Sequence, residues 1–141
     1  MDISIIYADK ENNGTKVKKV AEAFSHALAA QGHSVTLCNA YLEMGKNLTI
    51  SDYIVVGTTA TTAFGGKIPK VISDFLKRAG TISGKRCFAF ITNGGLRKNK
   101  SLQALMKVME AEGMYLKNFD IINKPELATA IGKRLEVQRN N

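Results

Sequence analysis

Short apolar runs alternate along the whole 141-residue chain with segments whose apolar residues recur every three or four positions. The runs are rich in β-branched residues and are bounded by polar stretches, which is typical of buried strands. The five expected strands cover Ile3 to Tyr7, Ser34 to Cys38, Tyr53 to Thr58, Arg86 to Thr92 and Phe119 to Ile122. The run at Tyr53 to Thr58 is continuously apolar, as in a central parallel strand that is covered on both faces.

The segments between these runs have the spacing of amphipathic helices. Helices are expected around Val17 to Leu28, from Pro69 to Leu76, around Leu102 to Met109 with Met114 as a further apolar position, and from Pro125 to about Arg134. Thr15 is a candidate N-cap of the first helix because its hydroxyl can accept a hydrogen bond from a first-turn amide. The alternation predicts one α/β domain over residues 1–141, in which a mostly parallel five-stranded sheet forms the middle of a three-layer α/β/α sandwich.

In such a sheet, ligands bind beyond the carboxyl ends of the strands. Two of the loops expected at that edge, 58–66 and 92–95, consist almost entirely of small or hydroxyl-bearing residues. Small residues let backbone amides approach a ligand closely, and hydroxyls add donors without bulk. This combination suits a flat heteroaromatic ring that carries carbonyls and ring nitrogens. Each loop alone is also compatible with ordinary turns, in which Gly and Thr are common.

Taken in order, these features resemble the flavodoxin family from Ile3 to about Leu135. The similar parts are the Ile-rich strand ending at Tyr7, the helix at Lys19 to Ala23, and the stretches Asp52 to Thr58, Phe64 to Pro69, Asp74 to Leu76 and Gly84 to Phe90. The resemblance implies the strand order 2-1-3-4-5 and FMN as the cofactor.

In that family, one loop cradles the FMN phosphate and two others flank the isoalloxazine ring. The resemblance implies a phosphate loop made of Asn12, Asn13, Gly14, Thr15 and Lys16. It implies ring contacts from Thr58, Thr59, Ala60, Thr61, Gly65, Thr92, Asn93, Gly94 and Gly95, with backbone amide donors at 59–61 and 93–95. Phe64, or alternatively Tyr41, is the implied aromatic residue that stacks on the ring.

The phosphate loop departs from the family pattern, which is Ser/Thr-x-Thr-Gly-x-Thr opening onto a helix. Hydroxyls and amides of that pattern satisfy phosphate oxygens at the positive helix end. Here the loop is one or two residues longer, Thr15 is its single hydroxyl residue, and Asp9 and Glu11 replace hydroxyl residues. A carboxylate that faces a phosphate repels it. Lys10, Lys16 and the backbone amides of residues 13–16 can compensate for this repulsion if both acids point outward.

The net charge of +8 is concentrated in one third of the chain. Residues 67–107 hold ten basic residues and one acid, Asp74, which gives this segment a net charge of +9. Such asymmetry is typical of a surface for an anionic partner, although it also suits a solvated face. We expect a redox partner protein or an anionic small molecule to dock near Lys67, Arg97, Lys98 and Lys100. Nucleic acid is not expected as a partner, because no aromatic residues are interleaved with the charges.

Other chemistry finds little support in the residue pattern. Cys38 and Cys87 fall on strands that are not neighbours in the implied order, so we expect two buried, unpaired thiols. His26 and His33 have no third ligand nearby, and neither a metal site nor a catalytic residue is predicted. No apolar run is long enough to span a membrane, and the N-terminus does not resemble a secretion signal, so a cytoplasmic location is expected.

These observations lead to one expected function and two alternatives. The expected function is an FMN-binding electron-transfer protein, in which the cofactor supplies the chemistry and the protein supplies binding and electrostatics. One alternative is a flavodoxin-like interaction or regulatory module that has lost FMN binding. The other is a small FMN-dependent NAD(P)H:acceptor reductase that acts on a quinone or a similar molecule.

Overall fold

The computed structural model describes residues 1–137 and contains alternating strands and helices throughout. In chain order the elements are β1 (Asp2–Ala8), α1 (Lys16–Ala30), β2 (Ser34–Asn39), β3 (Tyr53–Thr58), α2 (Lys70–Lys77), β4 (Arg86–Ile91), α3 (Lys98–Ala111), β5 (Tyr115–Ile121) and α4 (Pro125–Arg134).

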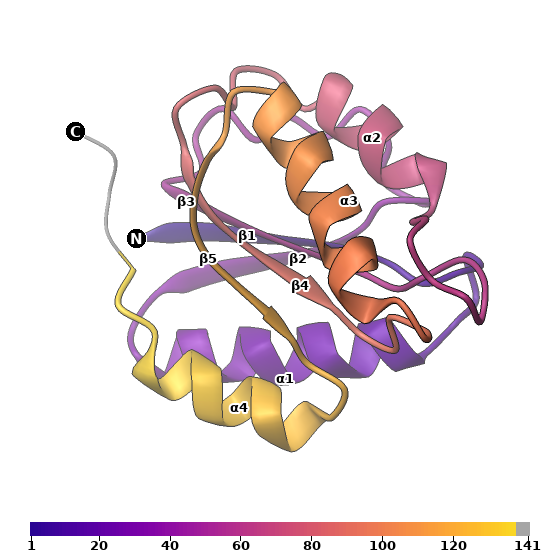
Figure 1. The fold of residues 1–141 in the computed structure, drawn as a ribbon. Coiled ribbons are helices and arrows are strands. Elements are labelled where there is room, and N and C mark those ends of the chain that lie inside the picture. Colours follow the sequence, from indigo (N-terminus) through magenta and orange to yellow (C-terminus); the bar gives the residue numbers. More distant parts are fainter. Residues whose placement is uncertain (138–141) are drawn as a thin grey trace.

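The five strands form one parallel sheet in the order β2-β1-β3-β4-β5. This finding confirms the predicted fold class and strand order. Helices α1 and α4 cover one face of the sheet, and α2 and α3 cover the other (Figure 1). All six residues of β3 are buried, as expected for the central strand of a sheet that is covered on both faces.

Two apolar cores lie on the two faces of the sheet, because successive side chains of a strand point to opposite faces. From β1, Ile3 and Ile5 join the core under α1 and α4, whereas Ile6 joins the core under α2 and α3. The ring of Phe24 on α1 meets the ring of Phe88 on β4 edge-on, with 5.2 Å between the centroids.

The last strand begins four residues earlier than the sequence predicted, at Tyr115 rather than Phe119. It is an edge strand that pairs only with β4, and five of its seven residues are exposed. An exposed edge strand carries no continuous apolar run, so the sequence signal covered only its end. Helix α3 likewise begins at Lys98, four residues before Leu102, the first apolar residue that marked it in the sequence. The start was missed because residues 98–100 are polar and exposed, and the helix ends at Ala111, before Met114.

Cys38 and Cys87 are buried and unpaired, as predicted. They lie on β2 and β4, which are separated by β1 and β3. Burial raises the pKa of the Cys38 thiol to about 11 and that of the Cys87 thiol to about 12. Among residues 1–137, no group of three His, Cys, Asp or Glu side chains is placed to hold a metal ion. No helix in this part of the chain has the length and apolar character needed to cross a membrane.

The close approach of β3 to β4 generates a prediction about stability. Gly57 lies opposite Phe90 in the sheet, and a Cβ atom at Gly57 would overlap the Phe90 ring. Gly57→Ala is expected to lower the free energy of unfolding by about 1–3 kcal/mol, because the packed ring must move. Urea denaturation followed by circular dichroism measures this change. Adding Phe90→Leu should recover part of the loss, and an unchanged urea midpoint in Gly57→Ala would contradict the prediction.

Candidate functional site

A cavity of about 850 Å³ opens at the carboxyl edge of the sheet. It lies between the loops that follow β1, β3 and β4. Its lining residues are Asp9, Lys10, Glu11, Gly14, Thr15, Lys16, Thr59, Ala60, Thr61, Thr62, Ala63, Asn93, Gly95 and Leu96. The volume is in the range of small-molecule sites, and most of these positions belong to the loops that the sequence singled out.

The carboxylate of Asp9 caps helix α1. Asp9 is buried, with 6% of its surface exposed, and its two carboxylate oxygens accept hydrogen bonds from the amides of Val17 (2.7 Å) and Lys18 (3.3 Å). A negative charge at this position also complements the positive end of the helix dipole. Thr15 is the N-cap residue of α1, as predicted, but the expected capping hydrogen bond is wrong, because the Thr15 hydroxyl bonds no first-turn amide.

The backbone of Asp9 is fixed from the opposite side by Tyr41. The Tyr41 hydroxyl donates to the carbonyl oxygens of Asp9 (2.8 Å) and Lys10 (2.9 Å). Burial raises the pKa of Tyr41, and the negative charges of Asp9 and Glu11 add to this effect. Tyr41 is not among the residues that line the cavity, so its hydroxyl serves to hold the first loop.

Gly14 lets the first loop close over Asp9. A Cβ atom at Gly14 would lie 2.5 Å from the Cβ of Asp9, and the Gly14 amide donates to the carbonyl of Glu11 at 3.0 Å. Of the residues expected to hold a phosphate, Gly14, Thr15 and Lys16 line the cavity, whereas Asn12 and Asn13 are exposed outside it.

Three threonine hydroxyls bind neighbouring backbone segments. Thr58 donates to the carbonyl of Ala8 (2.6 Å), and Thr92 donates to the carbonyl of Ile122 (2.8 Å). Both side chains are buried and join the ends of adjacent strands. Thr59, which lines the cavity, donates to the carbonyl of Asn93 at 3.2 Å.

The loops after β3 and β4 are hydrogen-bonded to each other at their tips. The amides of Leu96 and Arg97 donate to the carbonyls of Ala63 (2.9 Å) and Phe64 (2.8 Å). Gly95 has a φ of 74°, and a Cβ atom there would lie 2.6 Å from the Ala63 carbonyl oxygen, so this approach requires glycine. The two loops therefore form one wall, and the cavity lies between that wall and the first loop.

Ser101, in the first turn of α3, bonds both of these loops, and the sequence did not predict this role. This fully buried side chain accepts from the Gly66 amide (2.7 Å) and donates to the Gly94 carbonyl (2.9 Å). A serine in the first turn of a helix that follows a Gly-Gly loop is the sequence signal that marks it, because serine in such a position often bonds nearby backbone.

Only some of the ring contacts that the resemblance implied line the cavity. Those that do are Thr59, Ala60, Thr61, Asn93 and Gly95, whereas Thr58, Thr92 and Gly94 do not belong to its lining. The amides of Thr61 and Asn93, two of the six expected donors, are already bonded to the Lys67 carbonyl (3.0 Å) and to the Asn123 side chain (2.9 Å). Phe64 is 71% exposed, and neither it nor Gly65 belongs to the lining.

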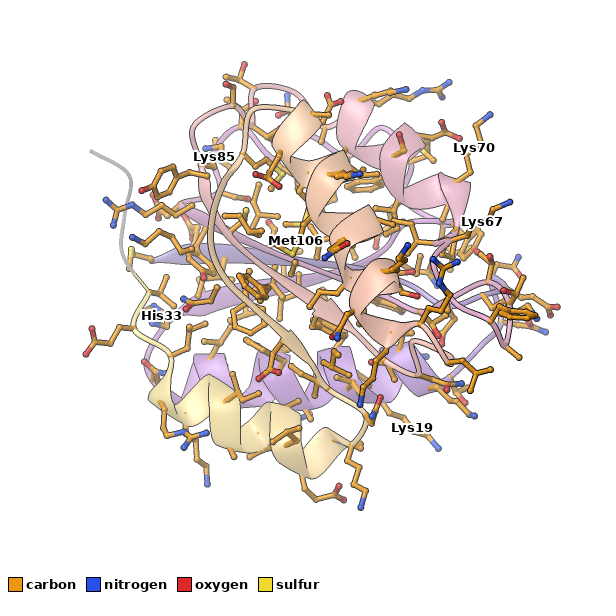
Figure 2. The ribbon with its side chains drawn as sticks, in the orientation of Figure 1. Lys19, His33, Lys67, Lys70, Lys85 and Met106 are labelled. Carbon is orange, nitrogen blue, oxygen red and sulfur yellow. The ribbon has the colours of Figure 1, made fainter. Side chains whose placement is uncertain are left out.

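Exposed cations surround the β4 side of the site. Lys67, Arg97, Lys98 and Lys100 are exposed, and none forms an ion pair with a carboxylate of residues 1–137. Figure 2 shows Lys67 extending outward beside Lys70 at the start of α2. Arg97 is the N-cap of α3, and the first turn contains Lys98 and Lys100 but no acid, so these three cations lie at the positive end of the helix dipole. Lys98 also lines a second hollow of about 410 Å³, together with Lys16 and Lys19.

FMN, which the resemblance implies, fits this site in part. The wall of small residues and the cavity volume fit a flat ring. The phosphate end fits less well, because the buried Asp9 carboxylate lies against the start of α1 and accepts hydrogen bonds from the amides of Val17 and Lys18, which directly follow the implied phosphate loop. Asp9 points inward, contrary to the orientation on which the expected compensation depends, whereas Glu11 is exposed.

No known family model and no curated protein matches the sequence. Solved structures are similar in fold. The flavodoxin of Streptococcus pneumoniae TIGR4 superposes with a TM-score of 0.74 at 14% identity, covering 95% of this chain and 94% of that chain. Oxidised flavodoxin 1 of Bacillus cereus has a TM-score of 0.72 at 12% identity, with coverages of 96% and 100%. An apo NADH:FMN oxidoreductase has a TM-score of 0.66 at 16% identity, with coverages of 93% and 84%. The chain therefore has a flavodoxin-like fold.

The cap on α1 generates a prediction. Asp9→Ala removes two hydrogen bonds at the positive helix end, so it is expected to lower the free energy of unfolding by about 1–2 kcal/mol. Glu11→Ala is the matched control, because it removes the same charge from an exposed position of the same loop and should change stability by less than about 0.5 kcal/mol. Urea denaturation compares the two variants. Equal effects would show that the Asp9 carboxylate does not cap the helix.

Proposed function

We propose that this protein binds a flavin ring in the 850 Å³ cavity and transfers electrons. The observation that carries this proposal is the position of the cavity, at the carboxyl edge of a flavodoxin-like sheet and against a wall of small residues. Ligands of open parallel sheets bind at this edge. The isoalloxazine ring is common to FMN and riboflavin, and it is the part of FMN that the cavity fits.

The flavin supplies the redox chemistry when bound, and the protein supplies the environment. Thr59 and Ala60 are almost completely buried but reach the cavity, so the wall excludes water on its inner side. Ser101 and the paired tips of the two loops hold this wall in place. We also propose a cytoplasmic location, because two unpaired thiols are typical of a reducing compartment.

The two alternatives make different predictions about the same cavity. The inward Asp9 carboxylate favours a module without FMN, and such a module would bind no flavin. An NAD(P)H:acceptor reductase would bind a flavin and would also oxidise NAD(P)H in the presence of a quinone. Flavin titration followed by a reductase assay therefore separates the three functions.

Filling the cavity tests the proposed function. Thr61 is half-buried in the lining, and Thr61→Trp is expected to weaken flavin binding by about tenfold or more, which is about 1.4 kcal/mol. Quenching of flavin fluorescence, measured with both riboflavin and FMN, reports the affinity. Ile50→Trp is the control, because Ile50 is 82% exposed and precedes the opposite end of β3. If the wild-type protein quenches neither flavin, the proposed function is wrong.

We further propose that an acidic redox partner or an anionic small molecule docks on the cations near the β4 loop. Lys67, Arg97, Lys98 and Lys100 lie at this edge without carboxylate partners among residues 1–137. Basic residues in the first turn of α3 oppose the helix dipole, so the isolated fold gains nothing from them. An approaching anion would gain from both the cations and the helix end.

Reversing one of these charges tests the docking surface. Lys98→Glu is expected to stabilise the fold by about 0.3–1 kcal/mol, because an acid then faces the positive end of α3. The same variant should weaken binding of an acidic peptide at low ionic strength. Thermal unfolding and peptide titration measure the two effects. Lys107→Glu is the control, since it makes the same charge change far from the first turn. Equal peptide binding by wild type and Lys98→Glu would exclude Lys98 from the surface.

A further inference from the structure

The N-terminus of α1 carries its own anion. The amides of Val17 and Lys18 are first-turn donors at the positive end of α1, where a phosphate is favoured, and both donate to the Asp9 carboxylate. Asp9 directly follows Ala8, the last residue of β1, and is therefore the first residue of the loop that lines the cavity. A phosphate and this carboxylate cannot accept the same two hydrogen bonds.

Contacts with Tyr41 and Gly14 hold the Asp9 carboxylate in its position at the start of α1. Tyr41 donates to the carbonyls of Asp9 and Lys10, which fixes the backbone on one side. Gly14 packs over the Asp9 side chain on the other, with room for no additional carbon atom. Moving Asp9 away would break two hydrogen bonds to a charged group at a buried position, and such bonds are stronger than neutral ones.

The rest of the cavity offers little to a phosphate. Its charged lining residues are two acids, Asp9 and Glu11, and two lysines, Lys10 and Lys16. Both lysines are exposed, so their attraction for a phosphate is weakened by water and salt. The lining is therefore neutral in total and contains a buried negative charge at the helix end.

We infer that Asp9 takes the place of the FMN phosphate and makes the cavity selective for flavins without a terminal phosphate, the riboflavin class, over FMN. This inference rests on the proposed function, because it requires that the cavity bind the flavin ring. In this arrangement the ring is held by the wall of the β3 and β4 loops, and the flavin side chain ends in a neutral hydroxyl near the first loop.

Paired titrations with riboflavin and FMN test the inference. Wild-type protein is expected to bind riboflavin about tenfold or more tightly than FMN, as judged by fluorescence quenching. Asp9→Asn keeps the shape of the side chain and removes its charge, so the ratio of the two affinities should shift toward FMN by about tenfold. Glu11→Gln is the matched control and should leave the ratio within about twofold of the wild-type value, because Glu11 bonds none of the α1 amides.

A second measurement on the wild-type chain keeps the test independent of the variants. Amide chemical shifts of Val17 and Lys18 should stay unchanged when inorganic phosphate is added, since these amides already donate to Asp9. Tighter binding of FMN than of riboflavin, or movement of these two amides with phosphate, would overturn the inference and leave the proposed function intact. Equal shifts of the affinity ratio in Asp9→Asn and Glu11→Gln would also overturn it. Absence of binding by both flavins would overturn both.

Discussion

Parallel pairing of the five strands brings the carboxyl ends of β1, β3 and β4 to one edge of the sheet, and every part of the candidate site depends on this arrangement. The helices that return the chain cover both faces, so the loops at the edge are the part of the fold that remains open to a ligand. Residues from three distant parts of the sequence therefore surround one cavity. The same topology directs the N-terminal ends of the helices toward that edge, where they favour negative charge.

The protein uses those helix ends in two opposite ways. At α1, a carboxylate of the chain itself satisfies the first-turn amides. At α3, the charged side chains of the first turn are Lys98 and Lys100, and no acid of the turn balances them. The two ends lie on either side of the 92–95 loop, which lines both the larger cavity and the lysine-bearing hollow. The first-turn amides of α1 are thus bonded to a carboxylate of the chain, whereas the start of α3 carries exposed cations, and the proposed flavin site and the proposed docking surface rest on this difference.

Much of the fold could be predicted from the sequence because it rests on local patterns. Apolar runs and helical spacing located all five strands and all four helices of the described chain, and α4 was predicted with its observed bounds. The start of β5 was missed because an exposed edge strand has no apolar run to mark it. The loops around the cavity were also found, since small residues cluster where backbones approach closely, as Gly95 and Ala63 do.

What each loop residue does could not be predicted in the same way. Thr58 and Thr92 look like ligand donors in the sequence, but their hydroxyls bond the carbonyls of adjacent strands. Ser101 lies outside the loops and still fixes them, because α3 brings it beneath Gly66 and Gly94. A hydroxyl bonds whatever acceptor the packed structure places near it, so the residue type alone does not define its partner.

The sequence by itself determined the α/β class, the edge of the sheet that carries the site and the segment that carries the positive charge. Only the tertiary structure decided where the Asp9 carboxylate points. That direction depends on the α1 amides eight and nine residues later and on Tyr41, which is 32 residues away. Contacts at such separations leave no local pattern, because the loop conformation that permits them forms only when β1, α1 and the segment after β2 pack together. For this reason the sequence pointed to an FMN site, whereas the structure places a buried carboxylate of the chain itself against the first-turn amides of α1.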